Sequence, residues 1–427
     1  MAKREKIAKG QVNSLGIDPR ELTVEQRREL FAKRKAEYAE DWRTIKPGSG
    51  LDLVPFNILA LDVVLRWGGL KRGGHIYSVH GDEGSSKSTL GYTVLREYQK
   101  GTGEPVVLFD YEGTTTSAYL RAIGVDEDQA HVETPLTIEE GIKKTVDFIG
   151  QGVRFFIFDS IPRMQPDVKD EDIKSGKAFK SSVGRHARAM ADFYRILLPK
   201  IRKVDGAFWM VNQTRSRIEA SQEAEAAAKG YDTITNLNYT MPGGRDHRFA
   251  VGNMAELKAV KAFRPDSLKE EDVWLFDDTA KRGEQYIVTR GRIRSLKNKA
   301  TGNGFREGSI WTRPGYGLDE NISIRELARA LGFITSKGKR WAIGRTFDEA
   351  VHVFDDKAAA LKALVVDENP ELLAATKKLV VDAVNADSSL FQFQVSDEEQ
   401  RYLAGEQSYE GDEPITNNKI ELAEDEL

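Results

Sequence analysis

Residues 75–89 read HIYSVHGDEGSSKST, and this stretch decides the fold. It predicts a short apolar strand, a loop of small residues, and a helix that opens on Lys87-Ser88-Thr89. Such a loop curls backbone N–H groups around phosphate oxygens, and the following helix directs its positive end at the same anion. The stretch therefore predicts a phosphate-binding loop, in which Lys87 reaches the β- and γ-phosphates and the Ser88 hydroxyl holds Mg²⁺.

The loop departs from the usual pattern, Gly-x-x-x-x-Gly-Lys-[Ser/Thr], at one position. Gly81 fills the first position, but Ser86 stands where the second glycine belongs. A Cβ there costs nucleotide affinity or turnover if the loop needs a positive φ. The alternative is a polar strand–helix connection without a ligand. The predicted nucleotide-binding positions are Gly81, Asp82, Glu83, Gly84, Ser85, Ser86, Lys87, Ser88 and Thr89.

Composition bounds the class of protein. The chain has 427 residues, of which 40% are hydrophobic and 30% charged, which suits a soluble globular protein. The absence of cysteine excludes disulfides and thiolate metal sites, and the six histidines show no zinc-ligand spacing. No apolar run reaches membrane-spanning length, and the first twenty residues lack the apolar segment of a secretory signal. We therefore expect a cytoplasmic protein with no membrane partner.

The net charge of −4 conceals an asymmetry along the chain. Residues 397–427 carry 11 acidic and 2 basic side chains, whereas residues 1–48 carry 12 basic and 8 acidic ones. Outside the tail, the chain is therefore net positive. A nucleic-acid partner is compatible with this distribution.

The chain divides into four predicted parts. Residues 1–48 form a charged, helical N-terminal arm, which we expect to pack between protomers; the alternative is that it is partly disordered. Residues 49–321 form the core. Residues 322–395 form a small C-terminal α/β domain with helices near 324–331 and 370–384. Residues 396–427 form an acidic tail, which we expect to be disordered because it has almost no apolar pattern.

The core is predicted to be an α/β fold. Continuous apolar runs at 76–79, 106–109, 155–158 and 208–211 are separated by helix-length sequence. This spacing predicts a mostly parallel central sheet flanked by helices, and residues 285–296 predict a later strand or hairpin. Two long polar stretches, about 167–183 and 215–248, interrupt this pattern, and loops of that length are usually functional.

Polar side chains follow the predicted strands where a parallel sheet binds its ligands. Glu112 follows the second run and could polarise a water molecule for attack on the γ-phosphate. Asp159 follows the third run and could hold the Mg²⁺ water shell. Gln213 follows the fourth and could sense the phosphate. The plainer alternatives are an ordinary loop glutamine, a helix cap and an exposed acid at a strand end.

The order and spacing of several motifs resemble the RecA-type homologous recombinases, over residues 52–427. The motifs are Leu59-Ala60-Leu61-Asp62, Gly68-Gly69-Leu70, Phe109-Asp110-Tyr111-Glu112, Tyr119-Leu120-Arg121-Ala122-Ile123-Gly124-Val125-Asp126, Phe158-Asp159-Ser160, Val211-Asn212-Gln213-Thr214-Arg215, Gly243-Gly244, Lys297-Asn298-Lys299 and Asn369-Pro370-Glu371. The departures are Ser86, an insertion at 219–229 and a poorly matched N-terminal arm. They indicate a divergent branch of the family, for which a phage-encoded origin is one interpretation.

The resemblance implies a role for each matching residue. Glu112 would be the base, Tyr119 would stack on adenine, and Gln213 would couple the γ-phosphate to the second long polar stretch, about 215–248. Lys297 and Lys299 would reach a neighbouring protomer's ATP. The alternatives are a packed core tyrosine and solvated lysines.

Coupling between subunits is implied for Arg248 and Phe249. The two long polar stretches, about 167–183 and 215–248, match the first and second DNA-binding loops of the family. The implied DNA-binding residues are Val183, Arg188, Arg195, Arg215, Arg217, Ile218, Gly243, Gly244 and Arg245. Arginines and glycine amides suit phosphates, and an apolar side chain can wedge between bases. The alternative for Arg188 and Arg195 is a solvated helix face.

The expected function is ATP- and Mg²⁺-dependent homologous pairing and strand exchange. The protein would form a helical filament of its own copies on single-stranded DNA, accept a homologous duplex, and hydrolyse ATP in response to DNA. One alternative is a hexameric helicase or other motor on the same fold. Another is a DNA-coating filament with little hydrolysis because of Ser86.

Overall fold

The computed structural model describes residues 53–167, 184–216, 239–240, 242–263, 288–302, 306–313, 316–356, 359–360, 363, 369–387 and 389–390, together with 23–26, 28–29 and 33. The chain forms two compact units, Met1–Asp52 and Leu53–Leu427. In the first unit a helix begins after Thr23, whose hydroxyl accepts from Gln26 N at 3.2 Å while Thr23 N donates to Gln26 Oε1 at 2.9 Å. This reciprocal pair is a capping box. Most of the predicted arm, and the acidic tail, lie outside the described residues.

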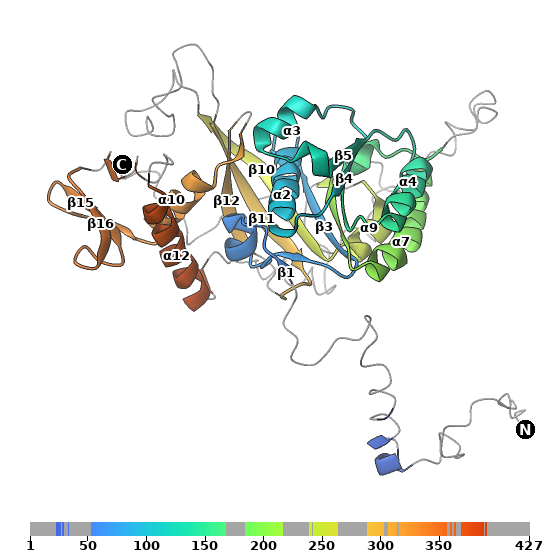
Figure 1. Cartoon of the computed structure of the whole chain (residues 1–427), viewed down its shortest axis with the longest axis horizontal. Helices are drawn as coiled ribbons and strands as arrows, with labels where there is room; N and C mark the ends of the chain where they lie inside the picture. Colours follow the sequence, from blue (N-terminus) through green and yellow to red (C-terminus); the bar gives the residue numbers. More distant parts are fainter. Residues whose placement is uncertain are drawn as a thin grey trace, which may run out of the picture. The chain divides into compact units, whose positions relative to one another are not determined.

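The larger unit contains the following elements (Figure 1). The strands are β1 (Leu53–Val54), β2 (Leu70–Lys71), β3 (His75–Gly81), β4 (Val106–Asp110), β5 (Ala130–Glu133), β6 (Phe155–Asp159), β7 (Ala207–Val211), β8 (Arg215–Ser216), β9 (Tyr239–Thr240), β10 (Asn253–Phe263), β11 (Val288–Asn298), β12 (Arg306–Arg313), β13 (Gly317–Leu318), β14 (Ile334–Lys337), β15 (Arg340–Gly344) and β16 (Ala350–Phe354). The helices are η1 (Ala60–Val64), α2 (Lys87–Thr102), α3 (Ser117–Ile123), η2 (Glu127–Gln129), α4 (Ile138–Gly150), η3 (Ile161–Arg163), α7 (Arg185–Lys203), α9 (Gly244–Ala250), α10 (Glu320–Ala330) and α12 (Pro370–Ala386).

A nine-stranded sheet organises this unit, in the order β13-β12-β11-β10-β3-β7-β6-β4-β5. From β5 to β10 the neighbouring strands are parallel, and β10 to β13 continue as an antiparallel extension. Each of the four predicted apolar runs is a parallel strand of this sheet. The mostly parallel α/β core is therefore confirmed.

The sheet is covered on both faces (Figure 1). Successive residues of β3 and β6 alternate between two hydrophobic clusters. Tyr77 and Ile157 join α2 residues in one cluster, whereas Ile76 and Phe158 join α4 and α7 residues in the other. Because side chains alternate across a strand, continuous apolar runs are what a sheet buried on both faces requires.

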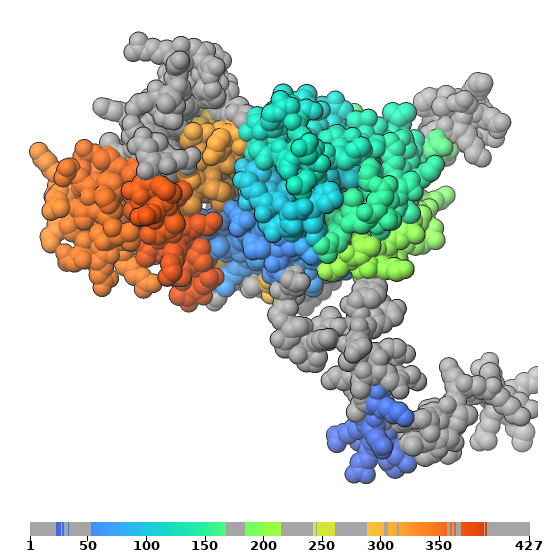
Figure 2. Space-filling model, viewed as in Figure 1, coloured from blue at the N-terminus to red at the C-terminus, as the bar shows by residue number. Residues whose placement is uncertain are grey.

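The C-terminal elements pack on the core through a third cluster, which contains Leu59 and Val64 of the η1 region with Ile324 of α10 and Val380 of α12. Figure 2 shows the space-filling surface of these elements, orange to red along the chain. Glu320 reinforces the contact because its half-buried side chain accepts from Leu59 N at Oε2, at 2.8 Å. The division between residues 49–321 and 322–395 remains a prediction.

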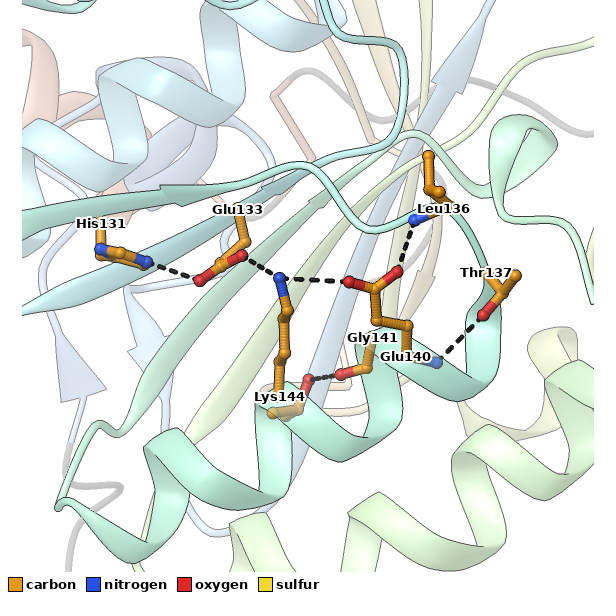
Figure 3. Close-up of polar contacts among 8 residues, drawn as sticks. His131, Glu133, Leu136, Thr137, Glu140, Gly141 and Lys144 are labelled. Carbon is orange, nitrogen blue, oxygen red and sulfur yellow. Dashed lines mark hydrogen bonds and ion pairs between the residues drawn. The ribbon is translucent and has the colours of Figure 1, made fainter. Parts of the chain in front are cut away.

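A polar cluster closes the β5 edge of the sheet (Figure 3). Glu133 accepts from His131 Nε2 at 2.7 Å and pairs with Lys144, whose Nζ lies 3.2 Å from Glu140 Oε1. Glu140 also accepts from Leu136 N at 2.9 Å, and the Thr137 hydroxyl accepts from Glu140 N at 3.1 Å. These contacts cap α4 and fix the turn before it.

Candidate active site

The predicted phosphate-binding loop joins the end of β3 to the start of α2, so the expected strand, loop and helix are all present. Lys87 is 7% exposed, and its Nζ donates to Asp82 O at 2.5 Å and to Ser85 Oγ at 3.2 Å. The Ser85 hydroxyl also donates to Asp82 O, at 2.7 Å. Burial lowers the pKa of Lys87, while the carboxylates of Asp159 and Glu112 act in the opposite direction. The loop therefore holds an ammonium group inside its curve, next to two acids.

Ser86 occupies the left-handed region, with φ 64° and ψ 25°. A residue with a Cβ is disfavoured there by roughly 1–2 kcal/mol, which explains why the usual pattern has glycine. Its hydroxyl lies 3.1 Å from Thr312 Oγ1 on β12. Ser86 thus combines a strained backbone with one polar contact that glycine lacks.

Ser86→Gly is expected to preserve or raise ATP turnover, because it removes the strain in the loop. Ser86→Ala is the matched control: it also removes the hydroxyl but keeps the Cβ at positive φ, so it should turn over ATP more slowly than Ser86→Gly. Nucleotide titrations and phosphate release measure both variants. A large loss of nucleotide binding in both would show that the contact with Thr312 outweighs the strain.

Glu112 and Gln213, predicted from separate strand ends, meet in space. Gln213 Nε2 donates to Glu112 Oε1 at 3.2 Å, and the Ser160 hydroxyl donates to the same oxygen at 2.5 Å. Asp110 fixes the loop that carries Glu112, because its carboxylate accepts from the backbone N–H groups of residues 112, 113 and 115. Both described side-chain bonds of Glu112 use Oε1, which leaves Oε2 for a water molecule.

Asp159 ends β6, directly beside Asp110 at the end of β4. It is 3% exposed, and burial raises its pKa to about 6, although the Ser88 and Tyr92 hydroxyls act against that shift. Tyr92 OH donates to its Oδ2 at 2.9 Å, whereas its Oδ1 is buried and receives no hydrogen bond from the described residues. A carboxylate oxygen in this position suits a hydrated Mg²⁺ shared with Ser88.

The described residues include no group of three or more His, Asp or Glu side chains that could hold a metal by themselves. A magnesium ion at Ser88 and Asp159 would therefore need phosphate oxygens or water to complete its octahedron. The donor set fits Mg²⁺ bound together with a nucleotide.

Tyr119 lies at the start of α3 and faces α2. Its hydroxyl is 2.7 Å from Thr89 Oγ1, and its ring meets the ring of Tyr92 edge-on at 6.0 Å. The N-cap Thr116 accepts from Tyr119 N at 3.2 Å and so fixes the start of this helix. The ring is half-buried, beside the helix that opens the phosphate-binding loop.

Lys297 and Arg248, predicted to act between protomers, contact each other. Lys297 Nζ donates to Arg248 O at 2.5 Å. Burial, followed by the charge of Lys299, lowers the pKa of Lys297 to about 8. Phe249 is 62% exposed at the end of α9. None of the described hydrogen bonds or ion pairs of Lys297 reaches the phosphate-binding loop of the same chain.

The predicted DNA-binding residues are only partly visible. Val183, Arg217 and Ile218 lie outside the described residues, and for Arg215 and Arg245 the structure describes the backbone alone. Arg188 and Arg195 are exposed on α7, where Arg195 pairs with Asp192 at 2.8 Å. Gly243 and Gly244 open α9.

Four further residues contribute to the site, and sequence patterns assigned none of them a role. They are Tyr92, Ser160, Thr214, whose hydroxyl donates to Asp82 Oδ1, and Thr312. Tyr92 could have been predicted from the sequence, because it follows Ser88 by four positions and so lies on the same face of the helix. Thr312 gave no local signal, because only the pairing of distant strands brings it to the loop.

Several known proteins similar in sequence to this chain come from one family. A family model described as the RecA N-terminal domain matches residues 46–236. The predicted resemblance to RecA-type recombinases is therefore confirmed. The chain is 28% identical to Protein RecA of Symbiobacterium thermophilum over 282 residues, which cover 66% of this chain and 70% of that protein. It is 26% identical to Protein RecA of Thermus thermophilus over 338 residues, covering 79% and 86%.

The identity to these relatives is low, so the resemblance to RecA-type recombinases is a divergent one. Protein RecA of Lactobacillus johnsonii is 25% identical over 348 residues, which cover 81% of this chain and 84% of that protein. In the part of the chain that the structure describes, no helix is both long and apolar enough to cross a membrane.

Proposed function

We propose that this chain is a DNA-dependent ATPase that forms a helical filament on single-stranded DNA and carries out homologous pairing and strand exchange. The observation that carries the proposal is the convergence of Glu112 and Gln213 on one hydrogen bond beside Lys87 and Asp159. In this proposal Glu112 is the base and Gln213 the amide sensor, next to the residues that would hold phosphate and metal. The match of residues 46–236 to the RecA N-terminal domain model supports the same function.

Each residue has a role in this proposal. When bound, ATP with Mg²⁺ supplies the phosphoanhydride that is cleaved and a cation that offsets its charge. Lys87 binds phosphate oxygens, while Ser88 and Asp159 hold the metal and its water shell. Glu112 orients a water molecule and accepts its proton at Oε2, because Ser160 and Gln213 hold the other oxygen in place.

Gln213 links this chemistry to DNA in the proposal. Its side chain contacts Glu112, and it lies two residues before β8, at the beginning of the second predicted DNA-binding stretch. Its neighbour Asn212 donates from Nδ2 to Pro242 O at 2.9 Å, at the far end of that stretch. Both ends of the stretch are therefore connected to the residues around Glu112. DNA held there would alter the position of the base.

Single-stranded DNA should stimulate phosphate release from ATP, and stimulation should require Mg²⁺. A steady-state phosphate-release assay with and without DNA tests this, combined with electron microscopy of the complexes. Slow release that DNA leaves unchanged, from continuous filaments, would support the DNA-coating alternative. Hexameric rings that unwind a partial duplex would support the motor.

A further inference from the structure

A buried histidine joins the strand of the phosphate-binding loop to two helices. His247 of α9 lies with Nε2 3.2 Å from Ser78 Oγ on β3 and with Nδ1 2.6 Å from Tyr194 OH on α7. Ser78 and His247 are 0% exposed, and Tyr194 is 4% exposed. None of the three is used in the chemistry proposed above.

Both ring nitrogens of His247 are engaged, and burial keeps the ring neutral by lowering its pKa to about 3. A neutral imidazole has one donor and one acceptor. Tyr194 OH donates to Met210 Sδ of β7 at 3.3 Å. The arrangement that satisfies every proton therefore has Nδ1–H donating to Tyr194 and Ser78 donating to Nε2. The result is a series of hydrogen bonds with fixed donors and acceptors, which runs from β3 through α9 to α7 and β7.

The elements joined by these hydrogen bonds adjoin the phosphate-binding loop and the two predicted DNA-binding stretches. Ser78 precedes Gly81, where the phosphate-binding loop begins, by three residues. The helix α7 begins at Arg185, directly after the first predicted DNA-binding stretch, and α9 begins at Gly244, near the end of the second. One imidazole thus connects the strand before the phosphate-binding loop with the helix that follows the first stretch and the helix in which the second stretch ends.

Close packing holds α9 in this position. A Cβ on Gly243 would lie 2.9 Å from His247 Cβ, and a Cβ on Gly244 would lie 2.8 Å from Ala187 Cβ of α7. Neither glycine can carry a larger side chain without displacing these neighbours. A shift of α9 relative to β3 or α7 would therefore break a buried hydrogen bond and leave polar groups without partners, which the protein interior disfavours.

We propose that His247 is a positioning residue that couples the phosphate-binding loop to both predicted DNA-binding stretches through Ser78 and Tyr194. The inference rests on the proposed function, because it needs DNA to stimulate ATP hydrolysis. It adds a second connection to the contact between Gln213 and Glu112, and this second connection runs through α9 and α7. Because α9 and α7 are closely packed, a displacement of either helix would be transmitted through His247 to β3.

The test compares Ser78→Ala, Tyr194→Phe and the double variant with the wild type. Each single change removes one hydroxyl and little volume. Hydrolysis without DNA should stay within about twofold of wild type, whereas the stimulation by single-stranded DNA should fall about fivefold or more, the scale of a typical coupling between sites. Because both hydroxyls belong to one series of hydrogen bonds, the double variant should lose little more of the stimulation than the worse single variant. His247→Leu should lose the stimulation as well.

Tyr98→Phe is the matched control, because Tyr98 is also buried and its hydroxyl contacts Glu104, which precedes β4, at the end away from Asp110. It should keep full stimulation. Thermal unfolding monitors the fold of every variant. Full stimulation in both single variants, or an equal loss with and without DNA, would overturn the inference while leaving the proposed function intact. A wild type that DNA does not stimulate would overturn the proposed function first.

Discussion

The Glu112→Gln variant should bind ATP as the wild type does and hydrolyse it about 100- to 10,000-fold more slowly in the presence of single-stranded DNA, the usual effect of losing a general base. The amide oxygen of glutamine can still accept from Ser160 and Gln213, so the local structure should persist. Only the ability to accept a proton from water is removed. Phosphate release measures the turnover, and titration with a fluorescent ATP analogue measures the binding.

Glu133→Gln is the control for this experiment. It neutralises another carboxylate on the same sheet, in the ion-paired cluster at the β5 edge (Figure 3). That variant should hydrolyse ATP at the normal rate. If the Glu112→Gln variant hydrolyses ATP at the wild-type rate, Glu112 is not the base.

The Lys87→Ala variant should bind ATP more weakly than the wild type does. A hydrogen bond to a charged group contributes roughly 1.5–3 kcal/mol, so the affinity for ATP should fall by about ten- to a hundredfold. The buried ammonium is held by Asp82 O and Ser85 Oγ, and its burial already lowers its pKa. Removing it should therefore affect binding more than folding, which equilibrium titration and thermal unfolding distinguish.

Lys100→Ala supplies the comparison within the same helix. Its side chain is 61% exposed and pairs only loosely with Glu97, at 3.6 Å. Exposed pairs of this kind contribute about 0–1 kcal/mol, so this variant should bind ATP normally. Equal ATP affinity in Lys87→Ala and the wild type would contradict the assignment of the phosphate-binding loop.

The core of the fold was predictable because its strands are buried on both faces. The runs at 76–79, 106–109, 155–158 and 208–211 carry the apolar signal of such strands, and the structure places all of them in one sheet. The edge strand β5 was not predicted, because Ala130–Glu133 is short and mixes polar with apolar residues. The pairing of β10 with β3, which the sequence does not reveal, depends on contacts between distant segments.

The candidate site was predictable to the extent that its residues follow strands. Parallel strands end at one edge, so the sequence alone was enough to group Glu112, Asp159 and Gln213. The contacts of Ser86 and His247 could not be foreseen, because their partners Thr312 and Tyr194 come from other parts of the chain. The sequence predicted a cost for Ser86 only if the loop requires a positive φ, and the structure has a φ of 64° at this residue.

Strand exchange with and without ATP tests the central claim most directly. The protein is first bound to a single-stranded circle in Mg²⁺ and then mixed with a labelled linear duplex, either homologous or unrelated. We predict joint molecules only with the homologous duplex and only when ATP is present, and none with Lys87→Ala. Joint molecules that form equally without ATP, or a homologous duplex left unpaired in its presence, would contradict the account.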